Sequence, residues 1–250
     1  MIIAQVSGEL YDSLGGSYTA NRRTDPRIAD LLWSRLGDAE TVLNVGAGAG
    51  SYEPPDREVI AVEPSATMRA QRPPGAPRCV AGRAEALPFP ADSFDVAMTA
   101  FSDWFWADQR AGFAEMRRVA RARVLVLTLD RSVAEEFWLS REYLPHAHEL
   151  WGSFGATLAN LGDCEAVVVP VPADCADGFF HAFWRRPHAY LEPSIREPMA
   201  VFRRLPHGET EAGLRRLSHD LATGAWQDRH GRLCEREALD LGYRLLVSEP

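Results

Sequence analysis

The chain has 250 residues, enough for one large domain, and 46% of them are hydrophobic, so a substantial core can form. This composition excludes a largely disordered chain. The formal net charge is -8 at pH 7, whereas a protein that binds nucleic acid through its phosphates needs a basic face, so we expect no nucleic-acid partner.

Cysteine spacing and the length of the apolar runs argue against a secreted, metal-binding or membrane protein. The four cysteines show no C-x-x-C spacing, which zinc sites usually have: Cys79, Cys164, Cys175 and Cys234. Apolar runs such as residues 124–127 are far shorter than the roughly 20 residues that span a membrane. The first residues, MIIAQVSGELYD, lack the segments of a signal peptide. We therefore expect a cytoplasmic protein with no metal site and no membrane partner.

The first predicted helix begins near Asp25, because aspartate is a favoured N-cap and Pro26 suits the first helical turn. We expect it to end at Gly37. Four apolar residues at helical spacing form the stripe that should face the core: Ile28, Leu31, Leu32 and Leu36.

Five short apolar runs then predict strands, at residues 42–45, 59–62, 79–80, 94–101 and 123–129. A short helix, capped by Ser65 and stopped by Pro73, separates the second run from the third. Residues 108–122 form another predicted helix. The last run is apolar at nearly every position, as expected of a strand that a parallel sheet buries on both faces.

Beyond residue 130 the pattern changes. Ser132 and Glu135 have the spacing of a capping box, which predicts a helix that carries Phe137 and Trp138 and stops at Pro145.

Two further strands are predicted at residues 165–170 and 243–249. Between them lies an insertion, at about residues 172–241, that is rich in aromatic residues. Within it, residues 209–226 form a predicted helix with three leucines facing inward: Leu214, Leu217 and Leu221.

Strands that alternate with helices indicate an α/β fold with a doubly wound, seven-stranded, mostly parallel sheet of the Rossmann-like kind. Residues 1–130 form the ligand-binding core, and residues 131–250 supply the rest of the same sheet together with the insertion. We expect this helical and aromatic insertion, which comes before the last strand, to cover the carboxyl edge of the sheet, where open α/β sheets bind their ligands.

The segment TVLNVGAGAGSYEPPDREVIAVEP, residues 41–64, places glycines between two predicted strands. Gly46, Gly48 and Gly50 have G-x-G-x-G spacing, and the two prolines that follow leave room for at most one helical turn. A dinucleotide site instead uses G-x-G-x-x-G and a helix whose N-terminus binds the pyrophosphate. The spacing therefore favours a ligand without phosphate, such as S-adenosylmethionine.

Residues near these glycines suit each part of that ligand. Glu63, at the end of the second strand, can accept hydrogen bonds from both ribose hydroxyls. Asn44 and Gly46 are placed to receive the ammonium of the amino-acid tail. Small residues between them let the backbone approach the ligand closely.

These motifs resemble those of the class I S-adenosylmethionine-dependent methyltransferases. VLNVGAGAGSYEP resembles the glycine motif of that family, and VIAVEPSATM resembles its ribose-binding motif. AGRAEALPFPADSFDVAMTAF resembles the adenine loop that leads into the fourth strand, and AEMRRVARARVLVLTLD resembles the helix and strand that follow. The resemblance covers roughly residues 10–130 and implies S-adenosylmethionine as the cofactor.

The resemblance also implies contacts with the adenosine. Met68 stands where a side chain often packs near it. Arg83 stands where many members have an acid, so we expect the backbone at Ala84 and Glu85 to recognise the adenine.

At the other end of the cofactor, the segment SYTANRR resembles a Tyr-x-x-x-Arg pattern that touches the methionine carboxylate in related enzymes. Tyr18 and Arg22 are therefore candidates for this contact. Positions next to the motifs complete the expected cofactor site: Ala47, Pro64, Ala100 and Phe101.

Methyl transfer from an activated donor mainly requires an aligned nucleophile and the exclusion of water. In SDWFWADQR, Trp104 and Phe105 stand where many relatives carry a pair of histidines, so we expect an apolar pocket with aromatic faces for a flat substrate or a cation. Trp138 and Tyr143 are further substrate-binding candidates. A general base would have to come from other residues, of which we consider three: Asp103, His146 and His181.

We expect the chain to transfer a methyl group from S-adenosylmethionine to a small, largely apolar or aromatic molecule. The chain contains no lysine, which suggests a GC-rich genome and is compatible with a tailoring step on a natural product. Two alternatives remain open. The glycine spacing disfavours a nicotinamide-dependent oxidoreductase, and the missing histidine pair leaves room for a non-catalytic protein that binds S-adenosylmethionine.

Overall fold

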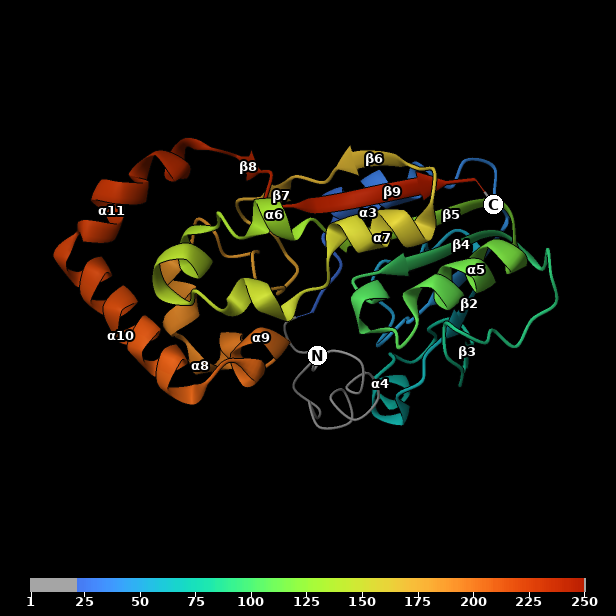
Figure 1. The fold of residues 1–250 in the computed structure, drawn as a ribbon, viewed down its shortest axis with the longest axis horizontal. Helices are drawn as coiled ribbons and strands as arrows, with labels where there is room; N and C mark the ends of the chain where they lie inside the picture. Colours follow the sequence, from blue (N-terminus) through green and yellow to red (C-terminus); the bar gives the residue numbers. More distant parts are fainter. Residues whose placement is uncertain (1–21, 250) are drawn as a thin grey trace.

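The computed structural model describes residues 22–249. Seven strands form its main sheet: β1 (Thr41–Val45), β2 (Glu58–Val62), β3 (Cys79–Val80), β4 (Phe94–Ala100), β5 (Ala120–Leu129), β6 (Glu165–Val168) and β9 (Tyr243–Ser248). Their order is β3-β2-β1-β4-β5-β9-β6 (Figure 1). The pairs from β3 to β5 are parallel, whereas β9 is antiparallel to both β5 and β6. The predicted doubly wound, mostly parallel sheet is therefore confirmed.

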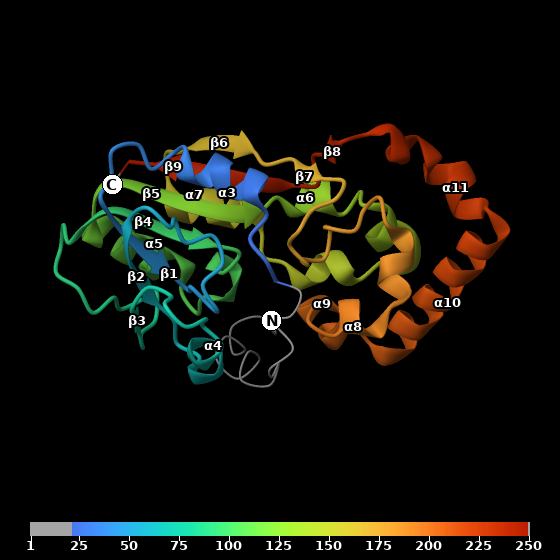
Figure 2. The same ribbon diagram turned by 180° about the vertical axis from the view of Figure 1, so that it is seen from behind.

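Helices lie against both faces of this sheet. The helices α5 (Gln109–Val119) and α7 (Phe154–Leu161) lie on one face, and α3 (Pro26–Trp33) lies on the other (Figures 1 and 2). Between residues 22 and 249, no helix is both long enough and apolar enough to cross a membrane.

The first two helices of the described residues, α3 and α4 (Ala66–Ala70), begin where the sequence predicts. The carboxylate of Asp25 accepts a hydrogen bond from the backbone N–H of Arg27 at 3.0 Å, and Ser65 caps the short helix α4. However, α3 ends at Trp33 and does not reach Gly37. A turn replaces the last part of the predicted helix. In this turn the backbone N–H of Leu36 donates to the carbonyl of Trp33 at 3.0 Å.

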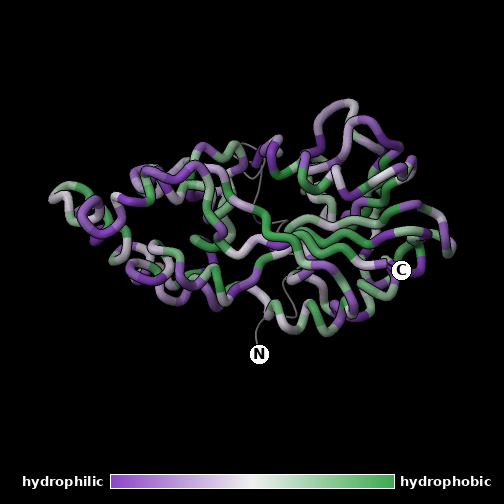
Figure 3. Tube along the Cα trace, turned by 90° about the horizontal axis from the view of Figure 1, so that it is seen from above, coloured by the Kyte–Doolittle hydropathy of each residue, from purple (hydrophilic) through white to green (hydrophobic). Residues whose placement is uncertain are grey.

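Strand residues alternate between two apolar clusters, one on each face of the sheet. Val42 lies in one cluster with Ile28 and Leu32 of α3, whereas Leu43 lies in the other with Phe113 of α5. Figure 3 shows the strands as a hydrophobic layer through the middle of this part of the molecule. Burial on both faces explains why these strands appear in the sequence as continuous apolar runs.

The connection from β1 to β2 contains no helix. Residues 46–57 form turns, and the helix that covers this part of the sheet, α3, comes before β1 instead. Tyr52 is buried in this connection, and its backbone carbonyl accepts a hydrogen bond from Trp33 Nε1 at 3.0 Å. The short connection predicted from the glycine and proline spacing is confirmed, so no helix N-terminus follows β1 to bind a pyrophosphate.

Residues 131–150 and 170–242 lie beyond the carboxyl ends of the parallel strands, and we call them the cover (Figure 1). They include a two-stranded antiparallel pair, β7 (Val171–Pro172) and β8 (Ala238–Leu239). The helical elements of the cover are α6 (Arg131–Ala134), the π-helix η3 (Leu139–Tyr143), η4 (Ala147–Leu150), η5 (Pro187–Leu191), α8 (Pro193–Arg196), α9 (Ala200–Arg204), α10 (His207–Thr223), α11 (Ala225–His230) and η6 (Gly231–Glu235).

The start of the cover differs from the prediction. Asp130, and not Ser132, caps α6, because the Asp130 carboxylate accepts hydrogen bonds from the backbone N–H and the hydroxyl of Ser132. The helix ends at Ala134, so Phe137 and Trp138 lie outside it. The predicted capping box is therefore wrong, since an acid one residue before the helix satisfies the first N–H groups instead.

The predicted helix at residues 209–226 is also divided in two. Gly224 takes the left-handed conformation, with a φ of 82°, and separates α10 from α11. Leu217 is buried, whereas Leu214 and Leu221 are only half-buried.

Aromatic side chains form the core of the cover, and three of them make hydrogen bonds to backbone carbonyls there. Trp138 Nε1 donates to the carbonyl of Trp184 at 2.9 Å, and Trp184 Nε1 donates to the carbonyl of Val171 at 3.1 Å. The hydroxyl of Tyr190 donates to the carbonyl of Phe180 at 2.6 Å. Most aromatic residues of the second half of the chain are therefore structural.

Substitution of Gly213 in α10 should destabilise the cover. An ideal Cβ at this position would lie 2.2 Å from the carbonyl oxygen of Tyr143, so the two segments would have to move apart. We expect Gly213→Ala to lower the free energy of unfolding by about 1–3 kcal/mol, measured by chemical denaturation. Gly208→Ala, in the same helix, is the control, because an ideal Cβ at this position would meet no atom of another segment within 4 Å among the described residues. A loss no larger than that of the control would contradict this packing.

Candidate functional site

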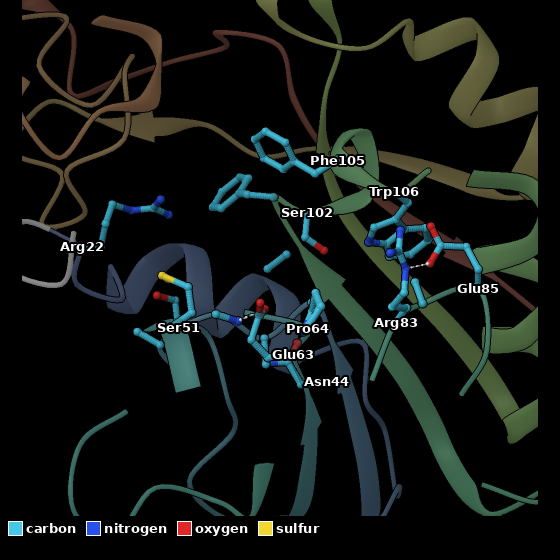
Figure 4. A pocket seen from close by; sticks show the side chains of 18 residues that line it. Arg22, Asn44, Ser51, Glu63, Pro64, Arg83, Glu85, Ser102, Phe105 and Trp106 are labelled. Atoms are coloured by element: carbon cyan, nitrogen blue, oxygen red, sulfur yellow. Dashed lines mark hydrogen bonds and ion pairs between the residues drawn. The ribbon is translucent and has the colours of Figure 1, made fainter. Parts of the chain in front are cut away.

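A pocket of about 840 Å³, open solvent at its mouth included, lies at the carboxyl ends of β1, β2 and β4, where the strand order reverses. We call it the switch-point pocket (Figure 4). It is lined by Arg22, Asn44, Gly46, Ala47, Gly48, Ala49, Ser51, Glu63, Pro64, Met68, Arg83, Ala84, Glu85, Ala100, Phe101, Ser102, Phe105 and Trp106. Of the cofactor-binding residues expected from the sequence, Gly50 does not line this pocket, and Tyr18 lies outside the described residues.

Gly50 has a structural role beside the pocket. Its φ is 99°, and an ideal Cβ would lie 3.1 Å from both Arg72 Nη1 and Glu53 Oε2. These two side chains form an ion pair of 2.8 Å that is almost fully buried. Gly50 therefore makes room for an ion pair, and it does not line the pocket in which the sequence analysis expects it.

Gly46 holds the loop after β1 close to β2 and to the end of β4. The backbone N–H groups of Gly46 and Ala47 both donate to the carbonyl of Val62, at 2.9 and 3.0 Å. Gly46 has a φ of 68°, and an ideal Cβ would lie only 2.2 Å from Ser102 Oγ. Only glycine fits here, and it lets the loop approach the end of β4 closely.

The carboxylate of Glu63 is held in the wall of the pocket by two backbone groups. One oxygen accepts a hydrogen bond from the N–H of Gly48, and the other accepts one from the N–H of Ser65, each at 2.8 Å. The residue is only 6% exposed, and this burial raises the pKa of Glu63 above its usual value of 4.5, although the two hydrogen bonds oppose the shift. Each oxygen retains a lone pair that can accept a hydroxyl proton.

Asn44 brings an acceptor without a partner to the same pocket. Its Nδ2 donates to Glu53 Oε1 at 3.1 Å, whereas its Oδ1 is buried and has no hydrogen-bond partner among residues 22–249. A buried acceptor of this kind is costly unless a ligand supplies a donor. The ammonium of an amino-acid tail is such a donor, so the residues present fit S-adenosylmethionine.

Different charged and aromatic side chains lie at the two ends of the switch-point pocket. Figure 4 shows Arg22 at one end and Arg83, Glu85 and Trp106 at the other. Glu85 Oε1 accepts a hydrogen bond from the backbone N–H of Ala107 at 2.7 Å, so its side chain is engaged with the protein.

Five lining residues are not among the binding residues expected from the sequence: Ala49, Ser51, Arg83, Ser102 and Trp106. Two of them directly flank the segment DWF after β4, which the sequence analysis already selects. Proximity to that segment is the signal that could have identified them.

A second pocket, of about 700 Å³ with open solvent included, adjoins the first, and we call it the aromatic pocket. It shares Arg22, Phe101 and Phe105 with the switch-point pocket. Its other lining residues come mainly from the cover: Trp104, Leu129, Leu150, Trp151, Gly178, Phe179, Phe180, Pro198, Met199, Ala200, Val201, Arg204 and Tyr243. The structure thus brings Trp104 and Phe105 to an apolar, aromatic pocket, as the sequence analysis expects.

A buried carboxylate holds the arginine at the junction of the two pockets. Asp177 is fully buried and accepts hydrogen bonds from Arg22 Nε at 2.7 Å, from Arg22 Nη2 at 3.2 Å and from the hydroxyl of Tyr52 at 2.9 Å. The Arg22 guanidinium lies over the ring of Phe101, 5.7 Å from its centroid. The cover, the segment before α3 and the loop after β1 therefore meet at Asp177.

Asp103 is removed from both pockets, which corrects its assignment as a candidate base. It is fully buried, and one carboxylate oxygen accepts hydrogen bonds from Thr128 Oγ1 at 3.0 Å, Gln109 Nε2 at 3.1 Å and Thr157 Oγ1 at 3.3 Å. Burial raises the pKa of Asp103 to about 6. Its position in the 3₁₀ turn η2 (Asp103–Phe105) therefore serves to connect β4, β5 and α7.

The two candidate histidines do not line either pocket. His146 is 60% exposed, and its Nδ1 lies 2.7 Å from Glu209 Oε2 at the surface. His181 is fully buried, its Nδ1 lies 2.8 Å from the Tyr243 hydroxyl, and burial lowers the pKa of His181 to about 3. The structure therefore does not support either histidine as a general base, because neither lies at the wall of these pockets.

The structure likewise does not support Trp138 and Tyr143 as substrate-binding residues. Both are buried in the core of the cover, and neither lines the aromatic pocket. The hydroxyl of Tyr143 donates to Asp220 Oδ2 at 2.8 Å, away from the two pockets.

Removing Asp177 should destabilise the protein strongly. Loss of one partner from a buried ion pair leaves an uncompensated charge, so we expect Asp177→Ala to lower the free energy of unfolding by about 3–5 kcal/mol. Asp174→Ala is the matched control in the same loop, because Asp174 pairs with Arg27 at the surface and is 75% exposed. The control should change stability little in the same urea titration. Equal effects of the two substitutions would contradict the role given to Asp177.

Comparisons with known proteins agree with this geometry. Residues 43–127 match a family model described as a methyltransferase domain. A solved structure from Anabaena variabilis, assigned as a methyltransferase from an antibiotic biosynthesis pathway, is 29% identical over 91% of this chain and 98% of its own, with a TM-score of 0.84.

Two further solved structures share the fold. The YcgJ protein of Bacillus subtilis is 19% identical over 89% of this chain and 97% of its own, with a TM-score of 0.52. The (4+2)-cyclase SpnF is 16% identical over 97% of this chain and 94% of its own, with a TM-score of 0.55. No curated protein matches the chain significantly.

The matched domain contains the glycine loop, Glu63 and the end of β4, which are the parts that build the switch-point pocket. This match supports S-adenosylmethionine over a nicotinamide nucleotide as the cofactor, and a methyltransferase over a non-catalytic binding protein. Residues 43–127 form a methyltransferase domain, and the cofactor of this domain is S-adenosylmethionine.

Proposed function

We propose that this enzyme methylates a small, largely apolar or aromatic acceptor. The observation that supports the proposal is the common wall of the two pockets, formed by Arg22, Phe101 and Phe105. A molecule in the aromatic pocket would therefore meet the cofactor directly, with no further segment between them. The lining of this pocket is mostly apolar, as pockets for small molecules usually are.

Within the switch-point pocket, we assign each polar side chain to the part of the cofactor that it can bind. The Glu63 carboxylate accepts hydrogen bonds from the ribose hydroxyls, and Asn44 Oδ1 accepts a hydrogen bond from the ammonium. Arg22, at the opposite end of the pocket from Glu85, attracts the methionine carboxylate. The adenosine lies near Met68 and the backbone of Ala84.

The bound cofactor supplies a methyl group that is already activated by the sulfonium. The protein then has to align the acceptor and exclude water. Among the described residues that line the aromatic pocket, none carries a carboxylate or an imidazole, so we assign no general base. Phe101 and Phe105, at the common wall, hold a flat acceptor against the methyl group and keep water away.

A tailoring step on a natural product is the context that we propose for this reaction. Its support is the 29% identity with the Anabaena variabilis protein, which is assigned to an antibiotic biosynthesis pathway, together with the aromatic lining of the acceptor pocket.

Loss of the Glu63 charge should weaken the binding of S-adenosylmethionine. We expect Glu63→Gln to cost about 1–3 kcal/mol, measured by calorimetry, while Glu58→Gln, at the exposed start of the same strand, has no effect. Because the pKa of Glu63 is raised above 4.5, wild-type affinity should also fall as the pH is lowered through that pKa and the carboxylate is neutralised. The Glu63→Gln variant should lack this pH dependence. Unchanged affinity in the variant would remove Glu63 from the site.

Filling the aromatic pocket should abolish turnover and spare the cofactor. We expect Ala200→Trp to lower kcat/KM for any aromatic acceptor by at least about a hundredfold, with the dissociation constant of S-adenosylmethionine unchanged. Production of S-adenosylhomocysteine with a panel of phenols, aromatic acids and aromatic amines is the measurement. Val168→Trp, on the exposed edge strand β6, is the control. Undiminished turnover in Ala200→Trp would place the acceptor elsewhere.

A further inference from the structure

A buried ion pair lies behind Asn44, outside the pocket itself. Asn44 lines the switch-point pocket (Figure 4), whereas Glu53 and Arg72 do not. Asn44 Nδ2 donates to Glu53 Oε1 at 3.1 Å, and Arg72 Nη2 donates to the two oxygens of Glu53 at 2.9 and 2.8 Å. The side chains of Glu53 and Arg72 are each only 6% exposed, so water competes little with these contacts. The three side chains therefore form one connected network that ends at the pocket.

This network fixes which end of the Asn44 amide faces the cofactor. A carboxylate paired with a guanidinium only accepts hydrogen bonds, so Glu53 favours Asn44 Nδ2 and repels Asn44 Oδ1. The Oδ1 atom is then left as the acceptor, and it has no hydrogen-bond partner among residues 22–249. Without Glu53, the amide could turn over and present its N–H groups to the ammonium, which would weaken the binding of that group.

The same contact gives a reason for a neutral amide at position 44. A carboxylate here would attract an ammonium more strongly, but one of its oxygens would replace Nδ2, which lies 3.1 Å from Glu53 Oε1. Two carboxylates at this distance in a buried place repel each other. Asn44 avoids this repulsion, because it can accept from the ammonium on one side and donate to Glu53 on the other. The negative charge stays on Glu53, where Arg72 compensates it.

The surrounding backbone restrains the ion pair. Arg72 Nη2 also donates to the carbonyl of Pro77 at 3.1 Å, in the segment before β3. At Gly50, an ideal Cβ would lie 3.1 Å from Arg72 Nη1 and from Glu53 Oε2, so the loop after β1 packs closely against both charged groups. Glu53 therefore has little room to move away from Asn44.

We propose that Glu53, supported by Arg72, is the positioning residue that makes Asn44 selective for the ammonium of the cofactor. The proposal rests on the role proposed above for Asn44, because Glu53 acts through that side chain and does not line the cofactor pocket. It gives a buried ion pair a function in cofactor recognition in addition to its contribution to packing.

The test compares two ligands that differ only in this group: S-adenosylhomocysteine and its deamino analogue, in which a hydrogen replaces the amino group. Their dissociation constants are measured by calorimetry with the full chain. We expect wild-type protein to bind S-adenosylhomocysteine at least about tenfold more tightly than the analogue. In Glu53→Gln, the single side-chain oxygen pairs with Arg72 and the amide nitrogen faces Asn44, so Asn44 turns over. The preference should be lost, with the affinity for the analogue unchanged.

Asp56→Asn is the matched control, because Asp56 lies in the same connection between β1 and β2 but pairs with Arg57 at the surface and is 66% exposed. It should keep the wild-type preference. Charge exchange supplies a rescue: the double variant Asn44→Asp with Glu53→Gln keeps one carboxylate beside Arg72 and lets the glutamine donate to position 44. We expect this double variant to recover the preference for S-adenosylhomocysteine.

Glu53→Gln leaves Arg72 without its anionic partner, so the variant may not fold. In that case Glu53→Gln with Arg72→Met removes both charges and should show the same loss of preference. A wild-type preference in either of these variants would overturn the proposal, as would an equal loss of affinity for both ligands, which would indicate a purely structural ion pair. If wild-type protein itself binds both ligands equally, the role proposed for Asn44 is wrong, and the role of Glu53 with it.

Discussion

The site depends first on the position of one carboxylate. Glu63 follows β2, next to the point between β1 and β4 where the sheet reverses its strand order, and its two oxygens are held by the N–H groups of Gly48 and Ser65. The first group belongs to the loop after β1, and the second belongs to the residue that caps α4. One side chain therefore links the two connections that border the pocket. Burial of this carboxylate has a cost in free energy, which the two hydrogen bonds offset in part.

The second constraint joins the sheet to the cover. Asp177 lies in the cover, but its carboxylate binds Arg22 before α3 and Tyr52 in the loop after β1. These three segments come from widely separated parts of the chain. Their meeting point lies at the common wall of the two pockets, so the geometry that would orient the cofactor also shapes the entrance to the acceptor pocket.

The sheet and the cofactor side of the site could be predicted from the sequence because both depend on local patterns. Strands buried on both faces form continuous apolar runs, and the glycine loop needs residues such as Gly46 that tolerate close contact and positive φ. Glu63 was predictable for the same reason, since it directly follows a recognisable strand.

The acceptor side could not be predicted in the same way, because it depends on contacts between distant residues. Asp103 looks accessible in the sequence, but Gln109, Thr128 and Thr157 enclose its carboxylate. His181 lies within the aromatic core of the cover for a similar reason. Asp177 has no sequence motif that marks it, and only the folding of the cover onto the sheet gives it its position.

The most direct test of the account is a crystal structure of the enzyme with S-adenosylhomocysteine. The account predicts that both ribose hydroxyls lie within hydrogen-bond distance of the Glu63 carboxylate, with the sulfur at the wall that Phe101 and Phe105 form between the two pockets. An S-adenosylhomocysteine molecule bound away from Glu63, or with its sulfur turned away from the aromatic pocket, would contradict it.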